Sequence, residues 1–163
     1  MPTRAVYTGS FDPITLGHLN IVRRGAALFD ELVIGIGINA EKKSLFDSAE
    51  RIELVRGAIA GLSNVTVATF NGLAVDFVRQ VNARVMLRGI RPLTDIAGEF
   101  TMMMANRQLA RDIETVFLMA DEEFAHVSSS LLKQIASLST DDHALAKFVP
   151  HSVIPALRSK LRP

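Results

Sequence analysis

Residues 9–18 bring together, near the start of the chain, groups that suit phosphate binding. His18 stands in the first turn of an expected helix, where free backbone N–H groups and the helix dipole attract an anion. Ser10 adds a hydroxyl donor. We expect Gly9 to adopt backbone angles that other residues avoid and Gly17 to let a ligand come close to the backbone. The segment therefore predicts a phosphate-binding loop, although it contains neither a Walker sequence nor the G-x-G-x-x-G fingerprint.

His18 also has an ordinary interpretation, as a histidine at a helix start whose ring is satisfied by a backbone carbonyl. Its position alone does not separate the two interpretations. As a ligand-binding group, it should resist protonation in an empty site because of the helix dipole, and a bound phosphate should favour its protonation. Either form of the ring can donate a hydrogen bond to a phosphate oxygen.

Two arginines, Arg88 and Arg91, follow directly after an apolar run at residues 85–87. Guanidinium groups contact phosphates through paired hydrogen bonds, so two of them just past a strand end favour an anion site. The alternative is a solvated turn. Asp95 and Glu99 follow at helical spacing. They either place carboxylates near the same rim or serve as ordinary acids at a helix start.

Two further segments carry donors. Residues 128–130 are three consecutive serines at an expected helix start. A helix N-cap explains one serine, and the others remain as donors at the positive helix end. Lys42 follows the second expected strand, where the ordinary interpretation is a solvated lysine. Residues 141–143, Asp-Asp-His, are interpreted as a solvated loop rather than a metal site, because adjacent side chains rarely converge on one ion.

These groups lie at the ends of short apolar runs that alternate with segments of helical period. The runs are expected to form strands at residues 5–8, 32–38, 65–68, 85–87 and 115–119. Their nearly continuous apolar character suits strands covered on both faces, as in a parallel sheet. Expected helices occupy residues 17–29, 48–60, 73–81, 96–110, 128–138 and 150–161.

This alternation predicts an α/β fold: a doubly wound, Rossmann-like, five-stranded parallel sheet with a C-terminal helical tail. We expect residues 1–163 to form a single domain. In such sheets ligands bind outside the carboxyl ends of the strands, where the strand order reverses. The three methionines at 102–104 cannot all face one side of a helix, so some of them should meet another surface, such as a subunit contact.

The composition excludes several classes of protein. The chain has 163 residues, 48% hydrophobic and 21% charged, which is typical of a globular protein and not of a disordered, collagen-like or coiled-coil chain. It has no cysteine, which excludes disulfides and thiolate chemistry. Because the net charge is +1, we expect neither nucleic acid nor a membrane as a partner. No targeting or membrane-spanning segment is recognised, so a cytoplasmic location is expected.

Three of these segments resemble the motifs of one enzyme family. Residues 9–18 end in T-L-G-H, which resembles the (T/S)-x-G-H signature of nucleotidyltransferases. Thr15 occupies the first histidine position of H-x-G-H, as in the bacterial phosphopantetheine adenylyltransferase family. Residues 88–91 resemble that family's R-G-(L/I)-R motif, and residues 127–130 resemble its I-S-S-S motif, with Val127 in place of isoleucine. The three motifs occur in the family's order.

The resemblance implies transfer of the adenylyl group of ATP to 4′-phosphopantetheine by direct in-line attack of the 4′-phosphate on the α-phosphorus, giving dephospho-coenzyme A and pyrophosphate. It implies catalytic roles for His18, Ser10, Lys42 and Arg88. The implied ATP-binding residues are Ser10, Phe11, His18, Gly89, Ile90, Arg91, Glu99, Phe124, Ala125, His126, Val127, Ser128, Ser129 and Ser130. The implied 4′-phosphopantetheine-binding residues are Ser10, Lys42, Leu73, Ala74, Arg88 and Asn106. It also implies Mg²⁺ that accompanies ATP without a dedicated metal site, and a homohexamer.

Two alternatives stay open. One is a nicotinate-mononucleotide adenylyltransferase or a cytidylyltransferase of the same superfamily, but those usually carry histidine where Thr15 stands and a threonine–arginine element in place of the three serines. The other is a non-catalytic nucleotide-binding module, which the set of His18, Lys42 and Arg88 disfavours.

Overall fold

The computed structural model describes residues 2–91 and 95–161. Its centre is a parallel sheet with the strand order β3-β2-β1-β4-β5. The strands are β1 (Arg4–Gly9), β2 (Glu31–Gly37), β3 (Val65–Phe70), β4 (Val85–Ile90) and β5 (Glu114–Met119). The order reverses between β1 and β4, so the chain winds outward in both directions from β1. The predicted doubly wound sheet is confirmed.

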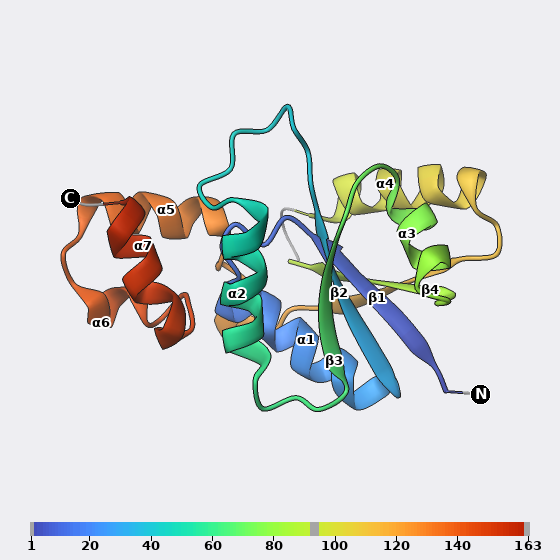
Figure 1. The fold of residues 1–163 in the computed structure, drawn as a ribbon, viewed down its shortest axis with the longest axis horizontal. Helices are drawn as coiled ribbons and strands as arrows, with labels where there is room; N and C mark the ends of the chain where they lie inside the picture. Colours follow the sequence, from blue (N-terminus) through green and yellow to red (C-terminus); the bar gives the residue numbers. More distant parts are fainter. Residues whose placement is uncertain (1, 92–94, 162–163) are drawn as a thin grey trace.

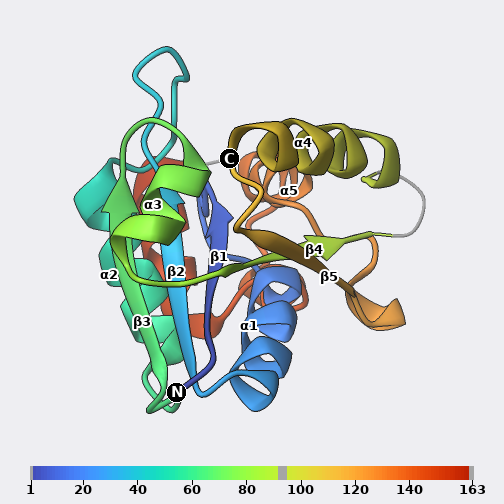
Figure 2. The same cartoon turned by 90° about the vertical axis from the view of Figure 1, so that its right-hand side faces the viewer.

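Helices cover both faces of this sheet (Figures 1 and 2). The helices described are α1 (Leu16–Leu28), α2 (Ser48–Ile59), α3 (Ala74–Gln80), α4 (Ile96–Leu109), α5 (Ser129–Leu138), α6 (Asp142–Leu145) and α7 (Ile154–Lys160). One face packs against α1, α2 and the C-terminal helices, and the other against α3. Right-handed crossovers on either side of β1 place the helices on opposite faces.

Alternate residues of the central strand serve the two hydrophobic cores. Ala5 and Tyr7 belong to the core under α1 and α2, while Val6 packs in the second core with Phe77 and Met86. This alternation is the period of an extended strand, and burial on both faces explains why β1 and β2 are nearly continuously apolar. The expectation is wrong for the edge strand β5, whose residues are exposed or half-buried.

The end of β4 differs from the prediction. Arg88 and Gly89 were expected in a loop, but they lie in the strand, because pairing with β5 continues through Gly89↔Leu118 and Ile90↔Met119. The side chain of Arg88 is therefore fixed by the sheet. Pro92, which completes the expected arginine loop, lies outside the described residues.

The C-terminal region also departs from the prediction. The expected tail helix is divided into a 3-10 turn at His151–Val153 followed by α7. The expected solvated loop at residues 141–143 contributes to α6: Asp141 caps that helix, and Asp142 forms an ion pair with Arg158 at 2.8 Å. Helix α6 is only four residues long, which is too short for a helical period of apolar residues to show in the sequence.

The first loop is unusual at Phe11 rather than at Gly9. Phe11 has a φ of +46°, and Gly72 is the glycine of the described chain with a positive φ. Gly9 is needed for space instead, because a Cβ there would lie 3.1 Å from the Phe11 ring. The absent side chain lets this ring fold back under the loop, where Phe11 is almost completely buried.

Gly35 in β2 lies against two stacked rings, Phe70 and Phe77, whose centroids are 4.8 Å apart. A Cβ on Gly35 would lie 2.6 Å from Phe77 Cε1, whereas a Cβ on Gly37 would lie 3.4 Å from Phe70 Cζ, an ordinary contact. We expect Gly35→Ala to lower the free energy of unfolding by about 1–3 kcal/mol, the usual cost of overpacking. The matched variant Gly37→Ala should cost less than about 1 kcal/mol. Urea unfolding of both variants measures the difference, and equal losses would contradict this packing.

Candidate active site at the strand ends

Two cavities meet at the carboxyl ends of β1 and β4, where the strand order reverses. The first, of about 310 Å³, lies between these strands, the start of α1 and the residues that lead into α5. The second, of about 440 Å³, lies toward α4 and the loops after β2 and β3. Residues common to both are Thr8, Gly9, Ser10, Arg88 and Glu99. A crevice at this position is where a doubly wound sheet binds its ligands.

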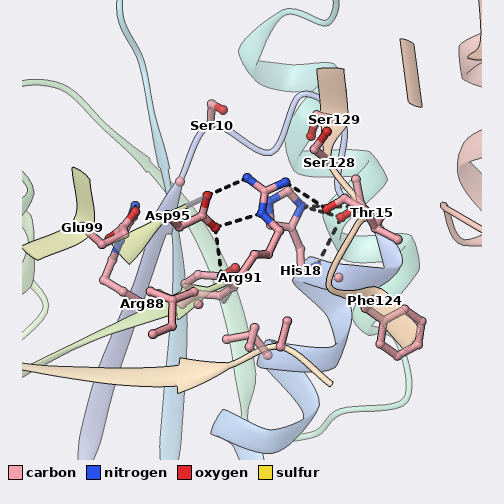
Figure 3. A pocket seen from close by; sticks show the side chains of 18 of the residues that line it. Ser10, Thr15, His18, Arg88, Arg91, Asp95, Glu99, Phe124, Ser128 and Ser129 are labelled. Atoms are coloured by element: carbon pink, nitrogen blue, oxygen red, sulfur yellow. Dashed lines mark hydrogen bonds and ion pairs between the residues drawn. The ribbon is translucent and has the colours of Figure 1, made fainter. Parts of the chain in front are cut away.

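His18 lines the first cavity from the first turn of α1 (Figure 3). Thr15 caps this helix: its hydroxyl accepts the backbone N–H of His18 at 3.2 Å, and its own backbone N–H donates to His18 Nδ1 at 3.1 Å. Because Nδ1 accepts this bond, the proton of the neutral imidazole is assigned to Nε2. The ring therefore keeps one N–H donor for a ligand.

The environment of His18 disfavours its charged form. Burial, followed by the positive charges of Arg91 and Arg88, lowers the pKa of His18 from 6.5 to about 4. The sequence predicted resistance to protonation from the helix dipole, whereas burial is the main cause here. At neutral pH the site therefore contains a neutral imidazole that donates through Nε2.

This protonation behaviour can be measured directly. We expect the His18 ring to titrate in proton NMR with a midpoint of about 4 in the ligand-free protein. Saturating ATP should raise that midpoint, because the negative charge of a nearby phosphate stabilises the imidazolium. The His18→Ala variant identifies the ring resonance of His18, because that resonance is missing from its spectrum. A midpoint near 6.5, unchanged by ATP, would contradict the site described here.

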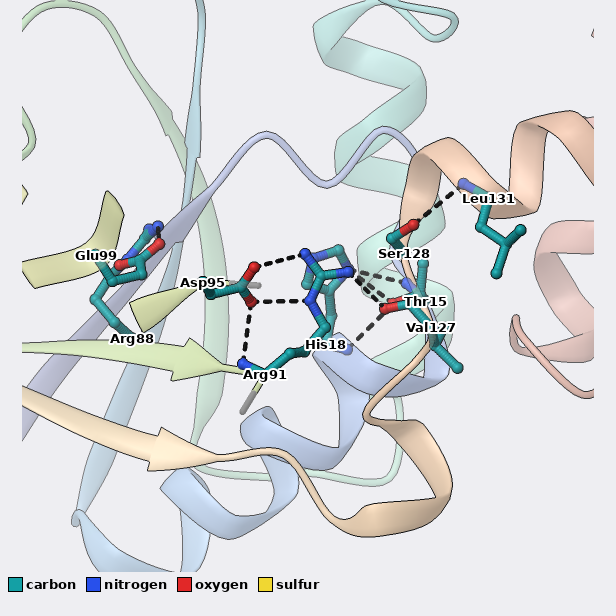
Figure 4. A network of polar contacts seen from close by, with 9 residues as sticks. All are labelled: Thr15, His18, Arg88, Arg91, Asp95, Glu99, Val127, Ser128 and Leu131. Atoms are coloured by element: carbon teal, nitrogen blue, oxygen red, sulfur yellow. Dashed lines mark hydrogen bonds and ion pairs between the residues drawn. The ribbon is translucent and has the colours of Figure 1, made fainter. Parts of the chain in front are cut away.

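Arg88 and Arg91 are each held by a carboxylate from the beginning of α4 (Figure 4). Arg88 contacts both oxygens of Glu99, through Nε at 2.8 Å and Nη2 at 2.6 Å. Arg91 contacts both oxygens of Asp95, through Nε at 2.8 Å and Nη2 at 2.9 Å. Bidentate pairs of this kind fix the plane of the guanidinium. The acids are therefore rim carboxylates that orient the arginines, one of the two interpretations that the sequence left open.

The three serines have different surroundings. Ser128 is the N-cap of α5 and accepts the backbone N–H of Leu131 at 3.1 Å. Ser129 donates to the carbonyl of Pro13 at 3.0 Å, which ties the start of α5 to the first loop. Ser130 is exposed, and all three line the first cavity. The cap explains one serine, as the sequence predicted, and leaves the others beside a positive helix end.

Lys42 lines the second cavity from the exposed loop that projects beyond β2 (Figure 1). The base of this loop is fixed by Asp12, whose carboxylate accepts the backbone N–H groups of Leu45 and Phe46, both at 2.8 Å. Lys133 donates to the same carboxylate at 3.2 Å. A buried acid thus fastens the loop that carries Lys42 to the loop that carries Ser10.

Comparisons with known proteins show the family to which this chain belongs. Residues 6–135 match the model of the cytidylyltransferase-like family. A phosphopantetheine adenylyltransferase from Rhodopirellula baltica is 74% identical over 157 residues, which cover 96% of this chain and 88% of the relative. The chain belongs to the phosphopantetheine adenylyltransferase family. Another member, from Leptospira biflexa, is 44% identical and covers 98% of each chain.

Two solved structures resemble this chain in fold. A nicotinic acid mononucleotide adenylyltransferase from Plasmodium falciparum, complexed with NaAD, superposes with a TM-score of 0.66 at 13% identity, over 98% of this chain and 96% of that chain. A Vibrio parahaemolyticus structure described as a nicotinate-nucleotide adenylyltransferase gives a TM-score of 0.68 at 18% identity, over 98% and 93% of the two chains. At these identities the likeness concerns the fold alone.

Most residues that the family resemblance implied do line the two cavities. The first is lined by Ser10, His18, Gly89, Ile90, Arg91, Glu99, Phe124, Val127, Ser128, Ser129 and Ser130. The second is lined by Ser10, Lys42, Leu73, Ala74, Arg88 and Asn106. Three residues are absent from both linings. They are Phe11, Ala125 and His126. Phe11 is buried, with its ring centroid 4.9 Å from that of His18, and the His126 ring packs against Phe148. Phe11 therefore supports the His18 ring.

Arg51 is a supporting residue that the sequence did not reveal. It is only 5% exposed, and its guanidinium donates to the carbonyls of Ser10 at 2.9 Å and Gly37 at 3.4 Å. These bonds hold the ends of β1 and β2 beside the shared wall of the cavities. Arginine in an amphipathic helix is usually solvated, so its type and spacing in α2 gave no signal of this role.

Within residues 2–91 and 95–161, no cluster of histidines and acids is placed to hold a metal ion. In the same part of the chain, no helix combines the length and apolar character needed to cross a bilayer.

Proposed function

We propose that this protein transfers the adenylyl group of ATP to 4′-phosphopantetheine, giving dephospho-coenzyme A and pyrophosphate. The observation that supports this most directly is the pair of cavities with a common wall at Ser10 and Arg88. A reaction between two phosphorylated substrates needs two binding sites whose phosphate ends meet. The first cavity, with its helix starts and serines, suits the nucleotide, and the second, with Lys42 and an apolar lining, suits the pantetheine arm.

The reaction needs positioning and charge neutralisation more than acid–base chemistry. An oxygen of the ionised 4′-phosphate attacks the α-phosphorus in line, a new P–O bond forms, and pyrophosphate leaves with the electrons of the bond that breaks. No strong base is required, because the nucleophile is already an anion. The Nε2–H of His18 and the hydroxyl of Ser10 would stabilise the charge that develops on the α-phosphoryl oxygens.

The remaining cations bind the ends of the two substrates in this proposal. Lys42 and Arg88 hold the 4′-phosphate, and Arg91 with residues 128–130 holds the β- and γ-phosphates. Asp95 and Glu99 of the first cavity are already paired with arginines. The site residues therefore fit a Mg²⁺ ion that enters with the triphosphate and is held through it rather than by these carboxylates. Mg²⁺ is commonly held through substrate phosphates and water, and it would neutralise triphosphate charge.

An acceptor comparison tests the proposal. The purified protein is mixed with ATP and Mg²⁺ and given either 4′-phosphopantetheine or nicotinate mononucleotide, with CTP and a phosphorylated alcohol as a third pair. Pyrophosphate release should occur with 4′-phosphopantetheine, together with dephospho-coenzyme A. Turnover with another pair alone would assign the chain to a different nucleotidyltransferase. ATP binding in calorimetry without turnover on any acceptor would indicate a binding module.

We also propose a homohexamer in the cytoplasm, where ATP is supplied. Helix α4 has no buried residue and carries several exposed apolar side chains, one of which, Phe100, stacks on Phe117 of the edge strand β5. They include Ile96, Phe100, Met102, Met104 and Leu109. An apolar surface of this kind is typical of a subunit contact, although Met102 and Met103 also line the second cavity. Light scattering should give a mass six times 17.8 kDa, and a monomer mass would reject the proposal.

A further inference from the structure

Tyr7 presents a polar group to the first cavity that neither the sequence motifs nor the proposed mechanism uses. It lies inside β1, is 6% exposed and lines the cavity. Within the described residues, the Tyr7 hydroxyl forms no hydrogen bond. Its oxygen nevertheless keeps some contact with solvent, at the cavity. A buried tyrosine hydroxyl normally finds a partner, so an unpaired one at a cavity wall indicates a ligand.

The direction of the side chain supports this interpretation. Tyr7 pairs with Leu87 in the sheet, but a Cβ built on Gly89 would lie 3.4 Å from the Tyr7 hydroxyl oxygen. Gly89 is two residues closer to the carboxyl end of β4 and lines the same cavity. The ring therefore leans toward the strand ends, and the missing side chain at Gly89 leaves room there for both Ile21 and the Tyr7 hydroxyl.

The surroundings of the hydroxyl favour an anionic acceptor. The Tyr7 ring lies edge-on to Phe11 with centroids 5.3 Å apart, and its centroid is 6.4 Å from that of His18. Burial raises the pKa of Tyr7 far above its ordinary value. The charges of Arg88 and Arg91 lower this pKa, and those of Glu99 and Asp95, which are paired with the two arginines, raise it. The hydroxyl thus stays protonated and can donate. His18, Arg88 and Arg91 around it are also donors, and a phosphoryl oxygen is an acceptor that all of them can share.

We propose that the Tyr7 hydroxyl donates a hydrogen bond to a phosphoryl oxygen of the bound nucleotide, as a further ATP-binding group on the floor of the first cavity. The inference rests on the proposed function only in taking the ligand of this cavity to be a nucleotide. It adds a neutral donor to the site. A neutral donor stabilises an anionic oxygen without strengthening the positive field that already lowers the pKa of His18.

Tyr7→Phe removes this donor and keeps the ring that packs against Phe11. Calorimetry with ATP should give a dissociation constant about 10- to 100-fold higher than wild type, the value of a hydrogen bond to a charged group. Adenosine, which lacks phosphate, should bind both proteins equally. Thermal unfolding should be unchanged within a few degrees, which separates loss of the bond from loss of structure.

The chain contains one tyrosine and no tryptophan, so its tyrosine fluorescence reports on Tyr7 alone. ATP and AMP should change this signal in the wild-type protein, and adenosine should leave it unaltered. Equal affinity of wild type and Tyr7→Phe for ATP would overturn the inference, as would an equal loss for adenosine, which would place the hydroxyl on the ribose or base. Because both measurements use ATP without an acceptor, they remain decisive even if the acceptor assay rejects 4′-phosphopantetheine.

Discussion

His18→Ala should reduce kcat for dephospho-coenzyme A formation by about 10²- to 10³-fold, the scale observed when one transition-state donor is removed. The reason is geometric: Nδ1 is occupied by the backbone N–H of Thr15, so Nε2–H is the donor left for the α-phosphoryl group. KM for ATP should change much less, because the bond strengthens as charge develops on the phosphorus oxygens. Steady-state kinetics in both substrates measures the two effects separately.

The matched variant for this prediction is His18→Gln, whose side-chain amide offers an N–H donor but no titratable group. It should retain part of the activity that His18→Ala loses. A decrease below about threefold in the alanine variant would assign His18 to a structural role, since one transition-state donor contributes far more.

His18→Ala should also change how the stability of the protein depends on pH in acid. His18 titrates with a pKa of about 4 in the folded protein and near 6.5 when solvated. Between these values the unfolded chain binds more protons than the folded chain, so wild type loses stability as pH falls from about 6.5 to 4. His18→Ala removes this contribution, and unfolding measured across that window should depend less steeply on pH.

Arg88→Ala and Arg91→Ala should affect different substrates. Arg88 lines both cavities, whereas Arg91 lines only the first. We expect Arg88→Ala to raise KM for 4′-phosphopantetheine by about 10- to 100-fold, the value of a charge-assisted hydrogen bond. Arg91→Ala should raise KM for ATP by a similar factor and leave that for 4′-phosphopantetheine nearly unchanged. Equal effects of both variants on both substrates would contradict the division of the site.

Arg88→Ala also leaves the carboxylate of Glu99 without its cation, and that charge would itself repel a phosphate. The double variant Arg88→Ala with Glu99→Gln removes this repulsion. If Arg88 binds the 4′-phosphate directly, the double variant stays defective for 4′-phosphopantetheine. Recovery of the wild-type KM would instead show that the single variant acted through the unpaired acid.

The sequence by itself determined the layers of this protein. Apolar runs covered on both faces predicted the strands, helical period predicted α1 to α5, and the three motifs at strand ends predicted the site and the family. These features depend on neighbouring residues, because strand period, helix period and N-caps are set within a few positions of the chain. Ser128 as the cap of α5 is an example in which local pattern and structure agree.

Only the tertiary structure decided which partners the site residues have. Glu99 lies 11 positions from Arg88, Arg51 lies 41 positions from Ser10, and Lys133 lies 121 positions from Asp12. Side chains this far apart meet because the crossovers bring separate strand ends to one edge, and no local period encodes that. The unpaired Tyr7 hydroxyl belongs to the same class: a tyrosine in a buried strand is an ordinary core residue until packing leaves its oxygen at a cavity wall.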